Sequence, residues 1–126
     1  MKKIIATDKA PGAIGPYSQA VQFTNMVFTS GQIAIDPATG ELNMADLNTE
    51  THQVMKNLKE VLAAAGLSFQ DVVKTSIFLA DMNDFAAVNE IYASYFEGDY
   101  PARETVQVAM LPKGVNVEIS MIAAHN

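Results

Sequence analysis

The chain has 126 residues and a formal net charge of −6, with seven lysines, a single arginine and no cysteine. This length suits one domain over residues 1–126, because folding removes roughly two-thirds of the surface of such an unfolded chain from water. The missing cysteines exclude disulfides and thiolate chemistry. An acidic chain with scattered lysines also argues against a nucleic-acid partner, which binds clustered cations.

The N-terminus predicts a soluble, cytoplasmic protein without a membrane partner. Two lysines follow Met1, but the apolar run after them stops at Ala6, after three residues. A membrane span needs about 20 apolar residues and a secretory signal about 7 to 15. The absence of cysteine also suits a reducing compartment.

Turn-forming residues divide the first third of the chain into short strands and loops. We expect a first strand over residues 3–6 and an irregular loop over Pro11–Pro16, which is rich in glycine and proline. Residues 21–23 and 26–30 have strand-like patterns and are separated by two residues, which predicts a tight hairpin. We expect another turn at Asp36–Gly40.

Helical spacing of apolar residues predicts two helices in the remainder, and β-branched runs predict three further strands. The helices extend over 48–65 and from Asp84 to Phe96, and the strands over 72–80, 104–110 and 115–123. We expect Asn48 or Thr49 to cap the first helix and Asp84 to cap the second. The order hairpin, helix, strand, helix, hairpin predicts an α+β domain whose two helices cover one face of the sheet.

The last predicted strand indicates that the other face of the sheet is also partly apolar. Val117 and Ile119 point one way, while Glu118, Ser120 and Ile122 point the other way. The strand before it carries apolar residues on both faces. Sheets of this kind usually bury their second face against another copy, so we expect a homo-oligomer with pockets at its interfaces.

Common catalytic motifs are missing. The two histidines are His52, which we expect to face solvent, and His125 near the C-terminus, and neither has a partner at metal-ligand spacing. There is no Gly-x-Ser-x-Gly motif, and Gly12 and Gly15 lack the rest of a phosphate-binding loop. We therefore expect no metal site.

Arg103 is the first candidate for ligand binding. It is the sole arginine and closely follows Pro101, where a strand is expected to begin. A planar guanidinium binds a carboxylate or phosphate through two parallel hydrogen bonds, which lysine does not reproduce. The alternative is an ordinary ion pair with Glu104 or with another acid at the sheet edge.

Glu118, Gly31 and Tyr17 are further candidates. Glu118 is either a polar residue of a strand face or, if a second subunit covers it, an acid whose pKa rises from about 4.3 far enough to transfer protons. Gly31 interrupts a strand-like run, which is typical of a bulge or of close approach by a ligand or another backbone. Tyr17 is either a core aromatic residue whose hydroxyl reaches solvent or a residue that lines a pocket.

Seven sets of short segments together closely resemble the reactive intermediate/imine deaminase A family, also called RidA or YjgF, essentially from end to end. They are Ile14–Ala20, Thr29–Ile33, Val73–Thr75, Asn83–Phe85 with Val88–Asn89, Pro101–Arg103, Leu111–Gly114 and Val117–Ile119. Pro-Ala-Arg and Val-Glu-Ile are the most specific of them. The resemblance implies an α+β, chorismate-mutase-like subunit with a mixed sheet of about six strands, and a homotrimer with clefts between its subunits.

The resemblance also implies an activity, the hydrolysis of 2-enamino and 2-imino acids to 2-oxo acids and ammonia without a cofactor. Such substrates include 2-aminoacrylate, 2-iminobutanoate and 2-iminopropanoate. In the implied catalytic set, Arg103 would clamp the substrate carboxylate, Glu118 would hold the attacking water and Tyr17 would pack beside the substrate. The implied substrate-binding set adds Ser30, Gly31, Asn89 and Thr105.

Glu104 and Thr105 mark where the chain departs from this family. The residue after the arginine is typically small there, so Glu104 would weaken carboxylate binding if it turned back and neutralised Arg103. We expect it to project away, because adjacent strand residues face opposite ways. Thr105 occupies a position where cysteine also occurs, and its hydroxyl is expected to alter substrate preference.

Two other functions stay open at this point. A non-catalytic sensor or regulatory protein could use the same cleft to bind a 2-oxo acid or another small carboxylate. The resemblance also brings a ribonuclease activity reported within the family. The acidic charge and the absence of a basic, aromatic-rich face argue against RNA as a partner.

Overall fold

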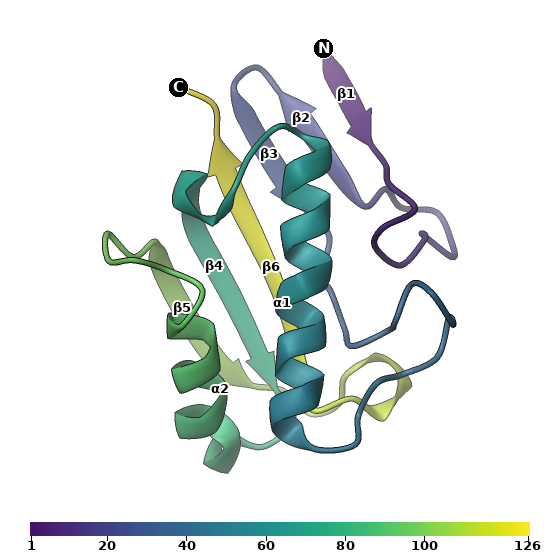
Figure 1. Ribbon diagram of the computed structural model, residues 1–126, viewed down its shortest axis with the longest axis vertical. Coiled ribbons are helices and arrows are strands. Elements are labelled where there is room, and N and C mark those ends of the chain that lie inside the picture. Colours follow the sequence, from purple (N-terminus) through teal and green to yellow (C-terminus); the bar gives the residue numbers. More distant parts are fainter.

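The computed structural model describes residues 1–126 and contains a six-stranded sheet with two α-helices (Figure 1). The strands are β1 (Lys2–Ile5), β2 (Ala20–Phe23), β3 (Met26–Thr29), β4 (Val72–Leu79), β5 (Ala102–Gln107) and β6 (Val117–Ala124). The helices are α1 (Leu47–Ala64) and α2 (Phe85–Ala93), and 3-10 turns cover Phe69–Asp71, Met82–Asp84 and Pro112–Gly114. The strand order is β1-β2-β3-β6-β4-β5. The predicted α+β class with a mixed sheet is confirmed.

The last two strands do not form the predicted hairpin. β5 pairs in parallel with β4, as is usual when a helix connects two neighbouring strands. β6 instead lies in the middle of the sheet, antiparallel to both β3 and β4. Every second residue of β6 is buried, so this strand gains more from a central position than β5, which has no buried residue. β5 is therefore a free edge of the sheet.

The helices lie close to their predicted ranges, but their caps differ. The Asp46 side chain caps α1 by accepting a hydrogen bond from the Thr49 N–H at 2.6 Å, so neither predicted cap is correct. Asp84 makes no capping hydrogen bond, because a 3-10 turn capped by Asp81 precedes α2. α2 ends early, at Ala93, because the next residues form tighter i→i+3 hydrogen bonds. Neither helix is both long and apolar enough to cross a lipid bilayer.

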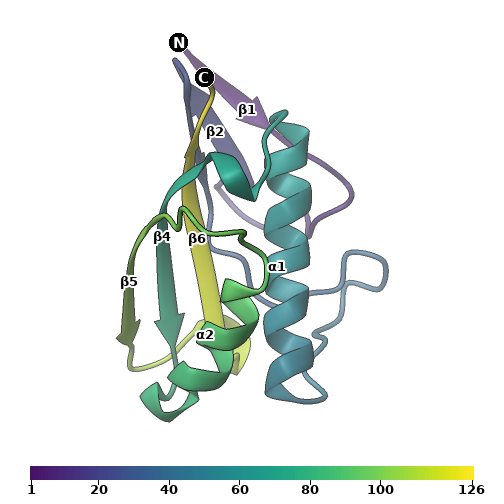
Figure 2. The ribbon, with the colours of Figure 1, turned by 60° about the vertical axis from the view of Figure 1, so that its left-hand side comes forward.

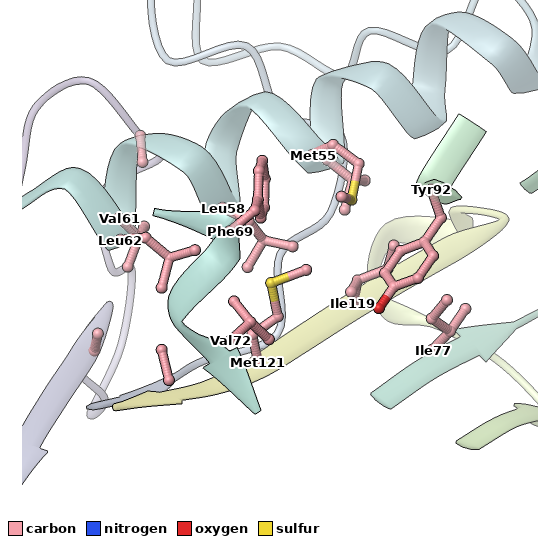
Figure 3. Close-up of a cluster of buried hydrophobic side chains, with 14 of the residues drawn as sticks. Met55, Leu58, Val61, Leu62, Phe69, Val72, Ile77, Tyr92, Ile119 and Met121 are labelled. Carbon is pink, nitrogen blue, oxygen red and sulfur yellow. The ribbon is translucent and has the colours of Figure 1, made fainter. Parts of the chain in front are cut away.

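The core lies between α1 and the centre of the sheet (Figure 3). Leu58, Val61 and Leu62 are fully buried, and their spacing of three to four residues places them on one face of α1. Ile119 and Met121 of β6 point toward this face (Figure 3). Each such side chain contributes roughly 1.5–3 kcal/mol by leaving water, which fixes β6 beneath α1.

Both helices cover the same face of the sheet, and the other face is open (Figure 2). Ile122 is half-buried on this open face, while Phe28, which lies opposite it on β3, is exposed. Val106 of β5 is also exposed there, next to Phe78 of β4. An apolar face of this breadth supports the predicted homo-oligomer, and the homotrimer itself stays a prediction.

Candidate functional site

Arg103 lies at the free edge of the sheet, on the face that the helices cover. Its position in β5, opposite Thr75 of β4, turns its side chain toward α2. The guanidinium Nη1 donates a hydrogen bond to Asn89 Oδ1 at 2.7 Å. The guanidinium carbon lies 5.1 Å from the centre of the Tyr92 ring and 5.6 Å from that of the Phe85 ring, within the range of cation–π attraction.

Three residues of α2 surround Arg103 because they share one side of the helix. Phe85, Asn89 and Tyr92 follow one another at spacings of four and three residues, which brings their side chains to the same face. Tyr92 is itself held in place, since it is buried and its hydroxyl donates a hydrogen bond to Thr75 Oγ1 at 2.9 Å. Burial raises the pKa of Tyr92, so this hydroxyl keeps its proton.

No carboxylate neutralises Arg103. The one ion pair in the structure joins Lys74 Nζ to Glu104 Oε1 at 2.8 Å, on the opposite face of the sheet. The hydrogen bond from Lys74 and a second one from Ser76 lower the pKa of Glu104. The alternative of an Arg103–Glu104 pair is therefore wrong, and the expected outward direction of Glu104 is confirmed. The guanidinium is left available for an external anion.

A cavity of about 460 Å³ opens beside the guanidinium. It is lined by Asn89, Tyr92, Ala93, Tyr100, Pro101 and Arg103. Thr105 follows two residues later on the same face of β5, and its Oγ1 is buried without a hydrogen-bond partner. A buried hydroxyl without a partner costs about 1–3 kcal/mol, so a ligand or a second subunit that bonded to it would be stabilising.

Glu118 lies on the other face of the sheet, close to its middle. Its position in β6 is opposite Phe78 of β4. The side chain is half-buried and forms no ion pair. Burial raises the pKa of Glu118 above its ordinary value, because leaving water disfavours the charged form. Such a carboxyl group is suited to taking up and releasing a proton.

Gly31 permits the position that Glu118 adopts. After β3 the chain continues beside β6, where Gln32 and Ile119 exchange two backbone hydrogen bonds of 2.8 and 3.1 Å. This pairing places Gly31 so close to Glu118 that a Cβ atom at residue 31 would lie 2.8 Å from Glu118 Cδ. Gly31 is therefore a point of close approach, but the group that approaches it is the Glu118 side chain, not the ligand or the second backbone that the sequence suggested.

Tyr17, Ser30, Gly31 and Glu118 line a second cavity of about 510 Å³. Tyr17 is 53% exposed, so its interpretation as a core aromatic is wrong. Lys113 also lines this cavity, and its backbone has a left-handed φ of 57° between proline and glycine. Backbone conformations of this kind are uncommon outside glycine and recur near functional sites.

The structure thus separates the predicted residues into two groups within one subunit. Arg103, Asn89 and Thr105 form one group, and Tyr17, Ser30, Gly31 and Glu118 form the other. Strand register explains the separation. Val106 of β5 and Glu118 of β6 both pair with Phe78 of β4, and residues that pair across neighbouring strands point to the same face of the sheet, here the open one. Arg103 is three residues from Val106 and therefore faces the helices. One subunit alone does not bring Arg103 and Glu118 together.

The sequence did not predict that Phe85 and Tyr92 contact Arg103. Their helical spacing with Asn89 was the available signal, but which strand residue they meet is not a local property. His52, which was expected to face solvent, is half-buried, and its Nδ1 lies 2.7 Å from the Tyr95 hydroxyl. No three histidine, aspartate or glutamate side chains converge on a metal-sized site.

The chain matches a family model described as Endoribonuclease L-PSP over residues 7–125. A mouse protein named 2-iminobutanoate/2-iminopropanoate deaminase is 54% identical over 125 residues, which cover 99% of this chain and 93% of the mouse protein. The structure of YyfA of the Rid protein family, from Yersinia pestis, has a TM-score of 0.97 at 49% identity and covers 99% of this chain and 100% of its own. The structure of E. coli TdcF with bound serine has a TM-score of 0.94 at 49% identity and covers 98% and 99%. The chain therefore belongs to the endoribonuclease L-PSP family, which is the RidA/YjgF family.

Proposed function

We propose that the protein is a hydrolase that deaminates 2-imino and 2-enamino acids to 2-oxo acids and ammonia without a cofactor. We expect 2-iminobutanoate, 2-iminopropanoate and 2-aminoacrylate among its substrates. The observation that carries this proposal is the guanidinium of Arg103, which has only neutral partners. The name of the mouse relative supports the substrate class. The serine bound to TdcF supports recognition of a small carboxylate with nitrogen on the adjacent carbon.

Arg103 would bind the substrate carboxylate through two parallel hydrogen bonds. Its bond to Asn89 orients the guanidinium without neutralising it, and the ring of Tyr92 restricts its movement. Hydrogen bonds to charged groups contribute about 1.5–3 kcal/mol each. A carboxylate held in this way presents the neighbouring C=N carbon in one orientation, which lowers the entropy lost in reaching the transition state.

Glu118 would transfer the protons of the reaction. Its carboxylate takes a proton from water while the water oxygen bonds to the carbon of the protonated imine, which gives a neutral carbinolamine. The protonated Glu118 then gives this proton to the nitrogen, the C–N bond breaks, and ammonia leaves. The Glu118 carboxylate takes the proton of the remaining hydroxyl as the carbonyl of the 2-oxo acid forms, and passes it to ammonia, which leaves as ammonium. An enamine substrate first takes a proton from solvent at its β-carbon and becomes the protonated imine. The raised pKa of Glu118 supports this role.

The two groups of residues would meet in a homotrimer. β5, which carries Arg103, is a free edge, and exposed apolar residues such as Phe28 and Val106 extend across the open face. In a ring of three copies, the Arg103 cavity of one subunit would lie against the Glu118 cavity of the next. Each interface would then contain one complete site, and the exposed apolar residues would be buried.

The test is a coupled assay in which a pyridoxal-phosphate-dependent dehydratase generates 2-aminoacrylate. The wild-type protein should accelerate the loss of 2-aminoacrylate, and Arg103→Ala should not. Light scattering should give the mass of a trimer for both proteins. Lys56→Ala, which removes an exposed cation from α1, is the matched control and should keep full activity. An unchanged rate in Arg103→Ala would refute the role of Arg103.

A mixing experiment tests whether subunits share the site. Arg103→Ala and Glu118→Gln are each expected to be inactive, but in mixed trimers some interfaces combine an intact Arg103 with an intact Glu118. If the two residues of a site come from different copies, mixing the two variants in equal amounts gives each residue a chance of about one half of being intact at a given interface. About one site in four is then complete. Verified mixed trimers without any restored activity would contradict a shared site.

The alternative is a sensor that binds a small carboxylate without converting it. The observation that favours it is that serine, which has no imine to hydrolyse, is bound in the structure of TdcF. A sensor would show saturable binding, no acceleration in the coupled assay, and unchanged binding in Glu118→Gln. We do not propose RNA cleavage, because the net charge of −6 and the single arginine provide no cationic surface for a phosphate backbone.

A further inference from the structure

Gln19 has a buried carboxamide that holds the loop preceding it. The residue lies next to the start of β2 and is only 5% exposed. Its Oε1 accepts a hydrogen bond from the Thr7 N–H at 2.7 Å. Its Nε2 donates to the carbonyl oxygens of Thr7 at 3.0 Å, Ala10 at 3.3 Å and Pro11 at 2.7 Å. One side chain therefore contacts four backbone groups that are eight to twelve residues away.

The segment that Gln19 holds has no regular structure of its own. Residues 6–19 connect β1 to β2 without forming a helix or a strand. Within this segment, one backbone hydrogen bond joins the Tyr17 N–H to the Gly15 carbonyl. Because buried backbone groups need partners, loss of the Gln19 amide would leave several of them unsatisfied and would free the loop to move.

The same segment forms one wall of the Glu118 cavity. Pro11, Ile14 and Tyr17 line this cavity. The opposite end of the segment is bonded to Ser30, whose N–H donates to the Gln19 carbonyl at 2.9 Å and whose hydroxyl donates to the Ser18 carbonyl at 2.5 Å. Gln19 thus connects the loop, through its side chain, to the strand end that carries Ser30 and Gly31.

We propose that Gln19 is a positioning residue whose carboxamide sets where Tyr17 lies relative to Glu118. This inference rests on the proposed function, because the Glu118 cavity is where we place the reaction. Gln19 also lines this cavity, but its Oε1 and Nε2 are both bonded to backbone groups of the loop. It therefore acts through that backbone, not as an acid, a base or a carboxylate ligand. Misplacing a group in an active site by about 1 Å lowers the rate by up to about 100-fold, so the effect is measurable.

Gln19→Glu is the main test variant. Its carboxylate keeps an acceptor for the Thr7 N–H but loses both N–H donors, and it places negative charge beside three carbonyl oxygens. Gln22→Glu is the matched control, because the same change there removes a single hydrogen bond to the Thr24 carbonyl. Gln19→Met, which is uncharged and of similar length, is measured alongside in case Gln19→Glu does not fold.

The first readout is the mobility of the loop. Lys9 is exposed within the held segment, so trypsin cleavage after Lys9 reports its opening, and hydrogen exchange at the Thr7 N–H reports the same event. We expect both rates to rise about tenfold or more in Gln19→Glu and to stay unchanged in Gln22→Glu. Rates equal to wild type in both Gln19 variants would overturn the proposal. This readout needs no substrate, so it is independent of the deaminase assignment.

The second readout is kinetic. We expect kcat/KM in the coupled assay to fall about 10- to 100-fold in Gln19→Glu. If Gln19 acts through Tyr17, the same change should lower kcat/KM by a smaller factor in a Tyr17→Ala background. Equal factors in both backgrounds, or a normal kcat/KM in a variant whose loop has opened, would overturn the proposal. A wild-type protein without deaminase activity would refute the proposed function instead.

Discussion

The Arg103 side and the Glu118 side of the candidate site are built in different ways. Arg103 stands on a strand and is surrounded by residues of one helix, of which Tyr92 is buried and bonded to Thr75. Glu118 also stands on a strand, but its surroundings come from loops, which depend on side-chain bonds such as those of Gln19. Packed elements hold groups more tightly than loops do. The residue proposed to bind the substrate is therefore the more rigidly supported of the two.

The largest expected effect tests whether the Glu118 side carries out proton transfer while the Arg103 side binds the substrate. In Glu118→Gln the amide cannot take a proton from water, so we expect kcat to fall about 10²- to 10⁴-fold with little change in KM. The wild-type kcat should rise with pH around a midpoint above the ordinary glutamate value of about 4.3, because burial raises the pKa of Glu118. Steady-state kinetics between pH 4 and pH 9 checks both. A kcat within about tenfold of wild type would remove Glu118 from the chemistry.

The next effect concerns binding on the Arg103 side. Arg103→Lys keeps the positive charge but loses the planar guanidinium, which offers two parallel donors and lies over the Tyr92 ring. We expect KM to rise about 100-fold, which corresponds to the loss of one charge-assisted hydrogen bond, while kcat changes less. Initial rates over a range of substrate concentrations separate the two parameters. A normal KM would mean that a point charge is sufficient and that the aromatic surroundings are incidental.

Gly31→Ala probes how closely the loop approaches Glu118. The new Cβ would lie 2.8 Å from Glu118 Cδ, so the carboxyl group must move. We expect about a tenfold loss of kcat and a destabilisation of about 1–3 kcal/mol. In a Glu118→Ala background the clash is absent, so urea unfolding should show that Gly31→Ala destabilises less there. Equal destabilisation in both backgrounds would contradict the contact as its cause.

Tyr92→Phe is expected to have a smaller effect on activity. It removes the hydroxyl that bonds to Thr75 Oγ1 and leaves that buried group without this partner. We expect a loss of about 1–3 kcal/mol in the free energy of unfolding, but only a few-fold rise in KM, because the ring beneath Arg103 remains. Denaturant unfolding and the coupled assay measure the two effects. A loss of kcat as large as that of Glu118→Gln would show that the two sides do not divide binding from chemistry.

The smallest expected effect is a pH-dependent change of stability. Burial raises the pKa of Glu118 in the folded protein, so its stabilising contribution is full below the pKa of the unfolded chain and is lost as pH rises through the folded value. Glutamine does not ionise. The free energy of unfolding of Glu118→Gln, taken relative to that of wild type, should therefore be higher at pH 8 than at pH 4. Urea unfolding of both proteins at these two pH values measures the difference. A difference of the opposite sign would mean that the neighbouring groups favour the charged carboxylate.

Most of the elements could be predicted from the sequence because their signals are local. The spacing of Leu58, Val61 and Leu62 indicated a helix, and the alternation around Ile119 indicated a strand with one buried face. Arg103 could be selected because its residue type is unique in the chain. Glu118 and Tyr17 were selected on residue type and family resemblance together, and the structure places both at one cavity.

The order of the strands and the environments of the candidates could not be predicted in the same way. Nothing local indicated that β6 lies between β3 and β4, or that Arg103 and Glu118 fall on opposite faces of one sheet. The cap of α1 was missed because Asp46, Asn48 and Thr49 are all suitable residue types, and only the folded backbone selects one of them.

By itself, the sequence determined the helices, most strands, the acidic charge and the choice of Arg103 as a candidate ligand-binding residue, because these depend on residue type and on spacing along the chain. Only the tertiary structure decided that Tyr92 meets Thr75, that Gly31 meets Glu118, and that Gln19 holds a loop. Such contacts join residues far apart in sequence. They are selected because the whole chain must bury its apolar residues and pair its buried polar groups at the same time.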